Sequence, residues 1–510
     1  MKSGRLTLVA MIFIVAMTMI DMTIVSIAAP DIQSELGLTG TGVQWIVTGY
    51  LVALAATFAL GGRLADVIGH RTMLISGTLL FIISSAMCGL TPKGSIAEEW
   101  IVGFRIAQGI GAAFLFPAAL AVIVSAFPLQ QRGRAVAIFF GIAGGLTAVG
   151  PFAGGYIVEW SWRGIFWINV PIAIIGLILT GFAKVENKRT PAPIDWIGAI
   201  LIAGGMGLTV LGLQQAQTWG WHSTPTLACI IAGVILIGFF IEFERKHKDP
   251  LIRIEFFSNR VFAAQNVVLL FASAAFVPVF FFASMYAQIG LGWSTSNSGL
   301  YLLTFFCGFA PGAQVGGRIL DKGSPRRAAI WGAAISAGGF WAWSARLESF
   351  NENIQWPWIV MAGFGLGMLI SSCNTDAINQ VPEENYGEAT GVTQTSRNFG
   401  ASLGIAILGT VMFTSLTDRI VTSLTGLGIP TDQAKSIADS MHGSSGGQPG
   451  AAFAQLGSQA DQAFQLIRAD FGAACQLAFR GLAIFMVIST VIAIVALPRN
   501  RAKKTEPANH

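Results

Sequence analysis

Long apolar segments recur along the whole chain, and they constrain its fold more than any other feature. A helix needs about 20 apolar residues to cross the hydrocarbon of a bilayer. Only 11% of the 510 residues are charged, against about 25% in soluble domains. We therefore expect an all-α integral membrane protein with fourteen transmembrane helices. The predicted spans are 7–29, 43–62, 72–90, 98–126, 133–157, 164–183, 195–213, 225–243, 261–286, 297–316, 327–344, 355–380, 399–417 and 475–497.

The distribution of basic residues predicts the orientation of these spans. Cytoplasmic loops of membrane proteins carry an excess of Lys and Arg. With the N-terminus in the cytoplasm, most of the 31 Lys and Arg residues fall in loops on that side, and Arg397 is among them. We expect both termini in the cytoplasm and the chain in the cell membrane. The net charge of +5 is explained by these loops, so no nucleic-acid partner is expected.

A short motif occurs twice at corresponding positions. Residues 61–66 read Gly-Gly-Arg-Leu-Ala-Asp after the second span, and residues 316–321 read Gly-Gly-Arg-Ile-Leu-Asp after the tenth. Such repeats predict two pseudo-symmetric six-helix bundles with an inserted helix pair between them. The expected parts are an N-terminal bundle (1–185), a linker with helices 7 and 8 (186–258), and a C-terminal bundle (259–510). The long outer loop 418–474, with helix-like stretches at 432–441 and 451–472, is either a flexible surface segment or a lid.

The fifth span is rich in glycine and contains a proline. Residues 141–155 read Gly-Ile-Ala-Gly-Gly-Leu-Thr-Ala-Val-Gly-Pro-Phe-Ala-Gly-Gly. Pro151 cannot donate to the carbonyl of Thr147, so the helix should bend there. Glycines let a neighbouring helix approach closely. Such a helix suits a protein whose halves move against each other. The residues concerned are Gly145, Gly150, Pro151, Gly154 and Gly155.

Three ionisable residues inside spans are candidates for function, because each costs about 2.5–3.5 kcal/mol to insert. Asp21 should face a water-filled cavity and exchange protons or bind substrate, unless it is a structural carboxylate bonded to nearby hydroxyls. Arg105 should be its buried partner, unless it reaches the outer interface. Asp376 is either a second proton or cation site or a solvated helix end.

The repeated loop motif suggests a cytoplasmic latch between the bundles. A carboxylate in such a loop can accept hydrogen bonds at a helix start and pair with a basic residue. We expect Asp66 to pair with Arg71, although an ordinary turn would also explain it. The latch residues are Gly62, Asp66, Gly69, Arg71 and Asp321.

Aromatic residues in the spans could line a cavity for flat apolar cations. Packing in the core or against lipid is the alternative for each of them. The candidates are Trp45, Tyr50, Phe114, Trp167 and Phe281.

Motifs of catalysis are absent from the sequence. It contains no phosphate-binding loop, no HExxH, no GxSxG and no Cys/His cluster. We expect no enzyme activity, no metal and no cofactor. The energy for any transport should therefore come from an ion gradient, and the buried carboxylates favour protons.

Together these motifs resemble the major facilitator superfamily, and within it the fourteen-helix drug:proton antiporters. The resemblance implies that Asp21 is a coupling acid, Arg105 its partner and Asp66 part of a latch, and that the Pro151 helix lines the interface between halves. Val67 and His70 stand where this family often has basic residues, and Ser26 where Asn is usual. The motifs that carry the resemblance are residues 21–30, 62–71, 105–113, 145–155 and 162–171.

We therefore expect a proton-coupled secondary exporter that alternates between inward- and outward-facing states. Its substrates should be amphipathic and often cationic drugs, dyes or biocides, so the chain would confer antibiotic resistance. A narrower exporter of an endogenous metabolite or lipid, or a proton-coupled symporter, is the alternative within transport. A membrane-embedded enzyme or a receptor is the alternative from another class. The expected partners are small molecules, protons and the bilayer, and the expected state is a monomer.

Overall fold

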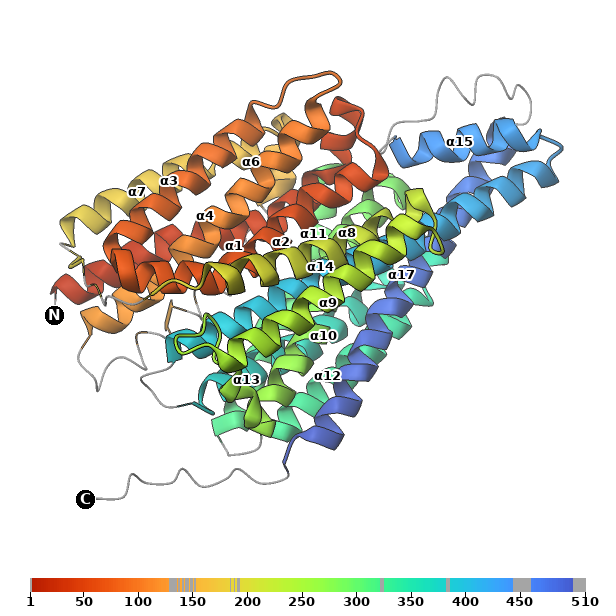
Figure 1. Ribbon diagram of the computed structural model, residues 1–510. Coiled ribbons are helices and arrows are strands. Elements are labelled where there is room, and N and C mark those ends of the chain that lie inside the picture. Colours follow the sequence, from red (N-terminus) through yellow and green to blue (C-terminus); the bar gives the residue numbers. More distant parts are fainter. Residues whose placement is uncertain are drawn as a thin grey trace.

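The computed structural model describes residues 2–127, 135, 138–139, 142, 146, 150, 153–183, 185–187, 189, 193–321, 325–381, 386–443 and 460–498. Long helices dominate this part of the chain (Figure 1). They are α1 (Lys2–Leu36), α2 (Gly40–Ile68), α3 (His70–Gly89), α4 (Ala97–Ala126), α7 (Asn169–Phe182), α8 (Trp196–Trp219), α9 (Thr224–Lys246), α10 (Arg260–Met285), α11 (Thr295–Asp321), α12 (Pro325–Ser344), α13 (Trp356–Ile378), α14 (Tyr386–Gly426), α15 (Thr431–Gly443) and α17 (Ala460–Ala496). Short elements are α6 (Gly164–Trp167), η1 (Ile254–Ser258), η2 (Tyr286–Gly290), η3 (Leu347–Ser349) and η4 (Glu352–Ile354).

The apolar segments of the sequence coincide with these helices, but the number of spans is not confirmed. Eleven helices in the described residues are long and apolar enough to cross a membrane. The predicted spans in α11 and α12 are not among them. Most of the predicted span 133–157 lies outside the described residues. The structure therefore supports an all-helical, multi-pass membrane protein, and the figure of fourteen stays a prediction.

Helix ends follow local chemistry. Thr39 precedes α2, and its hydroxyl accepts a hydrogen bond from the Gly42 N–H at 2.9 Å. Asn259 caps α10 in the same way through the Val261 N–H at 2.9 Å. Such caps satisfy donors that the first turn of a helix leaves free. Gly69 separates α2 from α3 with φ +114°, a conformation that side chains rarely adopt.

Equivalent helices pack together in the two halves of the chain. In the first half α2 and α3 pack on α4, and α1 packs on α7. In the second half α11 and α12 pack on α13, and α10 packs on α17. The repeated glycines make these contacts close: a side chain on Gly61 would overlap the backbone of Ala113, and one on Gly316 would overlap the backbone of Met368. The two copies of the motif thus occupy matching positions.

The helix pair α8 and α9 lies against the seam between the halves. The two helices pack on each other, and α8 also contacts α2 and α14 (Figure 1). The Gln214 amide on α8 donates to the Thr41 carbonyl at 3.2 Å, and Thr48 on α2 donates to Gln214 Oε1 at 2.9 Å. These bonds attach the inserted pair to the N-terminal half.

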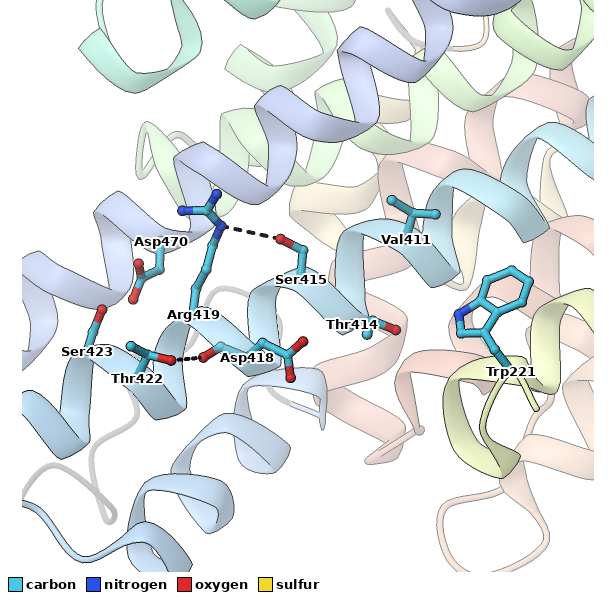
Figure 2. A pocket seen from close by; sticks show the side chains of 9 residues that line it. All are labelled: Trp221, Val411, Thr414, Ser415, Asp418, Arg419, Thr422, Ser423 and Asp470. Atoms are coloured by element: carbon cyan, nitrogen blue, oxygen red, sulfur yellow. Dashed lines mark hydrogen bonds between the residues drawn. The ribbon is translucent and has the colours of Figure 1, made fainter. Parts of the chain in front are cut away.

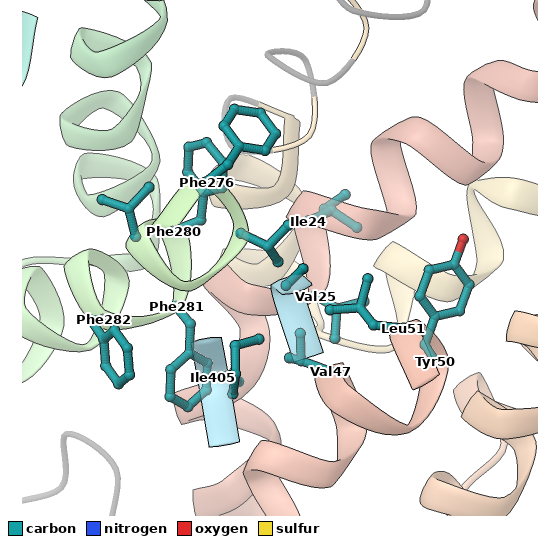
Figure 3. Packing of buried hydrophobic residues seen from close by; sticks show 14 of the residues in the cluster. Ile24, Val25, Val47, Tyr50, Leu51, Phe276, Phe280, Phe281, Phe282 and Ile405 are labelled. Carbon is teal, nitrogen blue, oxygen red and sulfur yellow. The ribbon is translucent and has the colours of Figure 1, made fainter. Parts of the chain in front are cut away.

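Apolar side chains fill the interface between the halves. Ile24 and Val25 of α1, Val47 and Leu51 of α2, and Ile405 of α14 are buried in one cluster with the aromatics of α10 (Figure 3). Phe281, predicted as a cavity aromatic, belongs to this cluster and is 0% exposed. The burial of these side chains in one cluster indicates that the two halves are closely packed at their interface.

Helices in two regions extend beyond the predicted spans. The region 418–474 is largely helical, because α14 continues to Gly426, α15 follows at Thr431–Gly443, and α17 begins at Ala460. At its other end α14 begins at Tyr386 rather than near residue 399. Arg397 therefore lies about three turns inside a helix, not in a cytoplasmic loop. The polar residues of this first part lower the local hydropathy, so the apolar span is shorter than the helix.

Candidate functional site

A buried ion pair joins α1 and α4 inside the N-terminal half. Arg105 Nη1 lies 2.5 Å from Asp21 Oδ2, and the side chains are 1% and 0% exposed. Arg105 also donates through Nε to the Ile46 carbonyl at 2.8 Å and through Nη1 to Gln108 Oε1 at 2.6 Å. The second carboxylate oxygen, Oδ1, accepts from the Gln108 amide at 3.0 Å and the Asn169 amide at 3.1 Å. The ionised carboxylate is therefore fully bonded.

The bonds around the pair extend to three further helices, α3, α6 and α7. The Asn169 amide on α7 also donates to Ser85 Oγ at 3.0 Å, and Ser85 on α3 donates to the Phe166 carbonyl at 2.8 Å. Six helices of this half, α1, α2, α3, α4, α6 and α7, thus contribute to one polar network in an apolar interior. Sequence analysis found the charged pair but gave no role to the amides of Gln108 and Asn169. A carboxamide inside an apolar run is the signal that could have identified them.

The sequence predicted that Asp21 faces a water-filled cavity, and this is wrong. The hydrogen-bond network encloses its carboxylate, which is 0% exposed. The central cavity lies beside the pair, and Tyr50 separates the two. The Arg105 guanidinium carbon stands 4.4 Å above the centre of the Tyr50 ring, and Tyr50 lines the cavity. This stacking is a cation–π contact. A change at the ion pair can therefore reach the cavity through one aromatic ring.

The central cavity is lined by both halves of the chain. Its volume of about 60 Å³ is well below the ~300–1,000 Å³ typical of sites for drug-sized ligands. The halves must therefore separate before such a molecule can enter. The lining comprises Thr18, Met19, Met22, Tyr50, Leu54, Phe58, Ala112, Phe116, Phe276, Gln394, Arg397 and Asn398.

The predicted cavity aromatics are mostly elsewhere. Of the five, only Tyr50 lines the central cavity. Trp45 and Phe114 are partly buried against the core, Phe281 is fully buried, and Trp167 is 41% exposed on the outside of the helices. Helical periodicity locates an aromatic on a face but does not tell which face meets the cavity. The structure shows three lining aromatics that were not among the candidates, namely Phe58, Phe116 and Phe276.

Asp376 forms a separate buried site in the C-terminal half. Its side chain is 0% exposed and accepts a hydrogen bond from Gln265 of α10 at 2.7 Å. Gln380 donates to its other oxygen at 3.3 Å. Asp376 is therefore not at a solvated helix end, and these two bonds come from its own half of the chain.

The described part of the Gly-Pro segment lies between the halves. Side chains on Gly150 and Gly154 would overlap α1 at Thr23 and Ile24, and one on Gly155 would overlap the start of α11. Gly145 and Pro151 lie outside the described residues. The close approach expected from the glycines is thus present at three positions, and the bend at Pro151 stays a prediction.

Asp66 pairs with a different residue from the one expected. His70 Nε2, at the start of α3, lies 3.1 Å from Asp66 Oδ1, whereas Arg71 is exposed. Gly62 and Gly69 flank this turn at the end of α2, and Asp321 is the last residue of α11. The Asp66 and His70 side chains meet across the break at Gly69, between the end of α2 and the start of α3, and the expected Asp66–Arg71 pair is not among the ion pairs of the described residues.

Hydrogen bonds between the halves gather where α1 ends and α11 begins. Thr295 of α11 donates to Asp31 at 3.1 Å, and the Gln288 amide donates to the Ile27 carbonyl at 2.9 Å. Ser296 donates to Glu159, and this bond lowers the pKa of Glu159 below its ordinary value of 4.5. These contacts close one end of the interface.

A second, larger depression lies at the periphery. It measures about 570 Å³ and lies between α14, α17 and the turn after α8. Figure 2 shows Arg419 of α14 donating to Ser415, at 3.3 Å, with Trp221 at the far edge. Its lining residues are Trp221, Val411, Thr414, Ser415, Asp418, Arg419, Thr422, Ser423 and Asp470. No group of three or more metal-ligating side chains is found here or elsewhere in the described residues.

Comparisons with known proteins place the chain among transporters. The family profile described as "Major Facilitator Superfamily" matches residues 11–405. The "Tetracenomycin C resistance and export protein" of Streptomyces glaucescens is 33% identical over 81% of this chain and 76% of its own. The "Multidrug resistance protein 3" of Bacillus subtilis is 28% identical over 83% of each chain. The "Cephamycin export protein CmcT" of Amycolatopsis lactamdurans is 30% identical over 77% of this chain and 81% of its own.

Solved structures support the same fold. A bacterial homologue of the human lysosomal transporter Spinster, in an inward-facing conformation, matches with a TM-score of 0.62 at 17% identity, covering 96% of each chain. A D-xylose-proton symporter matches with a TM-score of 0.58 at 15% identity, covering 86% of this chain and 94% of its own. At these identities the likeness concerns the fold alone.

Proposed function

The chain belongs to the major facilitator superfamily, and from this premise we propose that it is a proton-coupled exporter of amphipathic antibiotics, dyes or biocides. Relatives across the chain are named for export of, or resistance to, antibiotics. The cavity lined by both halves suits transport by alternating access, in which the two halves open first to one side and then to the other. The proposal covers compounds of either charge. Because Asp21 is already paired with Arg105, it does not select for a cationic substrate.

The observation that carries the coupling is the fully buried Asp21–Arg105 pair. An arginine stays charged at all relevant pH values, so the carboxylate must be the group that takes up a proton. A protonated Asp21 no longer pairs with Arg105, which weakens the attachment of α1 to α4. Proton uptake from outside would thus favour one arrangement of the helices, and proton release to the cytoplasm the other. Asp376, buried in the other half, is proposed as a second acid.

The remaining elements have supporting roles in this proposal. We place both termini in the cytoplasm and the chain in the cell membrane as a monomer. The turn around Asp66 would then act as the cytoplasmic latch, with His70 as its partner. The Gly-Pro segment would act as the sliding surface between α1 and α11. The proton gradient supplies the energy, and no cofactor is required.

Transport by purified protein in proteoliposomes tests the proposal. An imposed pH gradient should drive movement of ethidium or of an aromatic antibiotic, with protons moving in the opposite direction. Asp21→Asn should abolish this exchange, Asp376→Asn should reduce it, and Asp432→Asn on exposed α15 should leave it unchanged. pH-driven export that survives in Asp21→Asn would refute the assignment of the proton site. Absence of proton movement with every drug would refute the exporter itself.

A further inference from the structure

One charged side chain lines the central cavity, and it is a cation. Arg397 is the only charged residue among the described lining residues. It lies on α14 with Gln394 three positions before it and Asn398 one position after it. On a helix these spacings place the three side chains on one side. The helix α14 therefore contributes a polar, positively charged wall to the cavity.

The guanidinium of Arg397 has unused donors. Its Nη1 donates to Gln394 Oε1 at 2.9 Å, while its Nε is buried and has no hydrogen-bond partner. In the part of the chain that the structure describes, Arg397 forms no ion pair. A guanidinium carries five N–H donors and can hold a carboxylate or similar group through two of them. Arg397 is partly buried, so leaving its charge without a counter-charge is unfavourable, and an anionic ligand would compensate the charge.

Aromatic rings line the same cavity. Tyr50 and Phe58 of α2, Phe116 of α4 and Phe276 of α10 all line the cavity. The Phe58 and Phe116 rings lie 5.8 Å apart, centre to centre. Such rings favour a flat, apolar body, which can stack on them. Three of these rings come from the N-terminal half, and Phe276, like Arg397, comes from the C-terminal half.

We propose that the substrate is a flat aromatic compound that carries an anionic oxygen, and that Arg397 binds this oxygen. This assignment rests on the proposed export function and narrows its substrate class. A cationic drug would meet Arg397 at close range with no carboxylate in the lining to offset the repulsion. Asp21 does not supply that carboxylate, because it is enclosed by its own network. Binding occurs in the state in which the halves separate and enlarge the cavity.

Two dyes with one ring system and opposite charges test the proposal. Fluorescein is anionic at neutral pH, and tetramethylrhodamine methyl ester is cationic, while both contain a xanthene ring. Binding to the purified full-length protein is measured by fluorescence anisotropy. We expect fluorescein to bind the wild type and to lose at least tenfold in affinity with Arg397→Gln. Arg397→Lys should restore part of the affinity, since it keeps the charge but not the planar fork.

The control is Arg419→Gln, the same substitution on an exposed part of the same helix, which should bind fluorescein like the wild type. Thermal unfolding and size-exclusion profiles establish that each variant is folded. Cationic dye binding should be unchanged or stronger in Arg397→Gln. Equal losses for both dyes, wild-type affinity of Arg397→Gln for fluorescein, or no binding of fluorescein to the wild type would each overturn the assignment.

Transport is measured separately, so that the two proposals can fail independently. Fluorescein binding that depends on Arg397, without export driven by a pH gradient, would uphold the binding site and refute the exporter. Export of the cationic dye alone would uphold the exporter and refute the anion site.

Discussion

Loss of the negative charge at Asp21 should destabilise the fold by a predictable amount. Asp21→Asn keeps the shape of the side chain and leaves the Arg105 guanidinium, 1% exposed, without its counter-charge. Removing one partner of a buried ion pair costs about 3–5 kcal/mol. The bonds from Gln108 and Asn169 to Oδ1 can persist with the Asn oxygen, so they add little to this cost. We expect the free energy of unfolding to fall by about 3–5 kcal/mol.

A double-mutant cycle separates the ion pair from the rest of the site. Arg105→Met leaves Asp21 charged and unpaired, so it should cost a similar amount. The double variant Asp21→Asn, Arg105→Met buries no charge at this position and should be less destabilised than the two single losses combined. We expect a coupling energy of at least about 2 kcal/mol, which is large for a contacting pair.

The assay is reversible unfolding in mixed micelles, followed by far-ultraviolet circular dichroism. The matched control cycle uses Asp418→Asn and Arg419→Met, which change the same residue types on the exposed surface of α14. Exposed substitutions of this kind should stay within about 0.5 kcal/mol. A loss below about 1 kcal/mol for Asp21→Asn, or additive losses in the cycle, would refute the reasoning. Arg105 would then have an alternative partner that the structure does not contain.

Two further predictions concern the interfaces. Gly316→Ala should lower the melting temperature strongly because its Cβ would overlap the Met368 backbone, whereas the neighbouring Gly317→Ala, with open space around it, should not; equal effects would contradict this packing. Ser296 donates to Glu159 and lowers its pKa below 4.5, so this contact should be complete above pH 4.5 and lost as the pH falls through the lowered value. Spin labels across α11 and the segment ending at Glu159 should report this separation, and Glu159→Gln should remove its pH dependence; an unchanged profile would contradict it.

Hydropathy located the helices because the bilayer imposes their length, but it placed some ends poorly. The bilayer requires about 20 apolar residues and says little about polar helix beyond them. The α14 helix shows the effect: Gln394, Arg397 and Asn398 lowered the local hydropathy, so the predicted span began near residue 399 while the helix begins at Tyr386. The most informative residue of the cavity was therefore assigned to a loop.

Sequence analysis identified the buried ionisable residues, but it did not predict which side chains they contact. Asp21 and Arg105 stand 84 positions apart, and nothing in one sequence indicates that their side chains meet. The amides of Gln108 and Asn169 occupy the place of the water expected around Asp21. These amides come from other helices, so predicting the contact requires knowing how those helices pack. Contacts between distant segments depend on helix rotation, and composition does not determine it.

The positions of the two cations constrain how protons could drive export. Protonation of Asp21 leaves the charge of Arg105 uncompensated behind the Tyr50 ring, 4.4 Å away, in addition to Arg397 in the cavity. An anionic substrate would then be held more tightly, so direct competition between proton and substrate does not explain exchange. Coupling must act through the helices: α1 carries Asp21 and also the Asp31 and Ile27 contacts that close one end.

A binding measurement without a gradient distinguishes these two mechanisms. Asp21→Asn imitates the protonated acid, so it should bind fluorescein at least as tightly as the wild type while failing to exchange protons. The comparison is made on folded protein, at one pH, so that the dye keeps its charge. Weaker binding by Asp21→Asn would mean that the ionised carboxylate supports the anion site, and coupling through α1 would then lose its main argument.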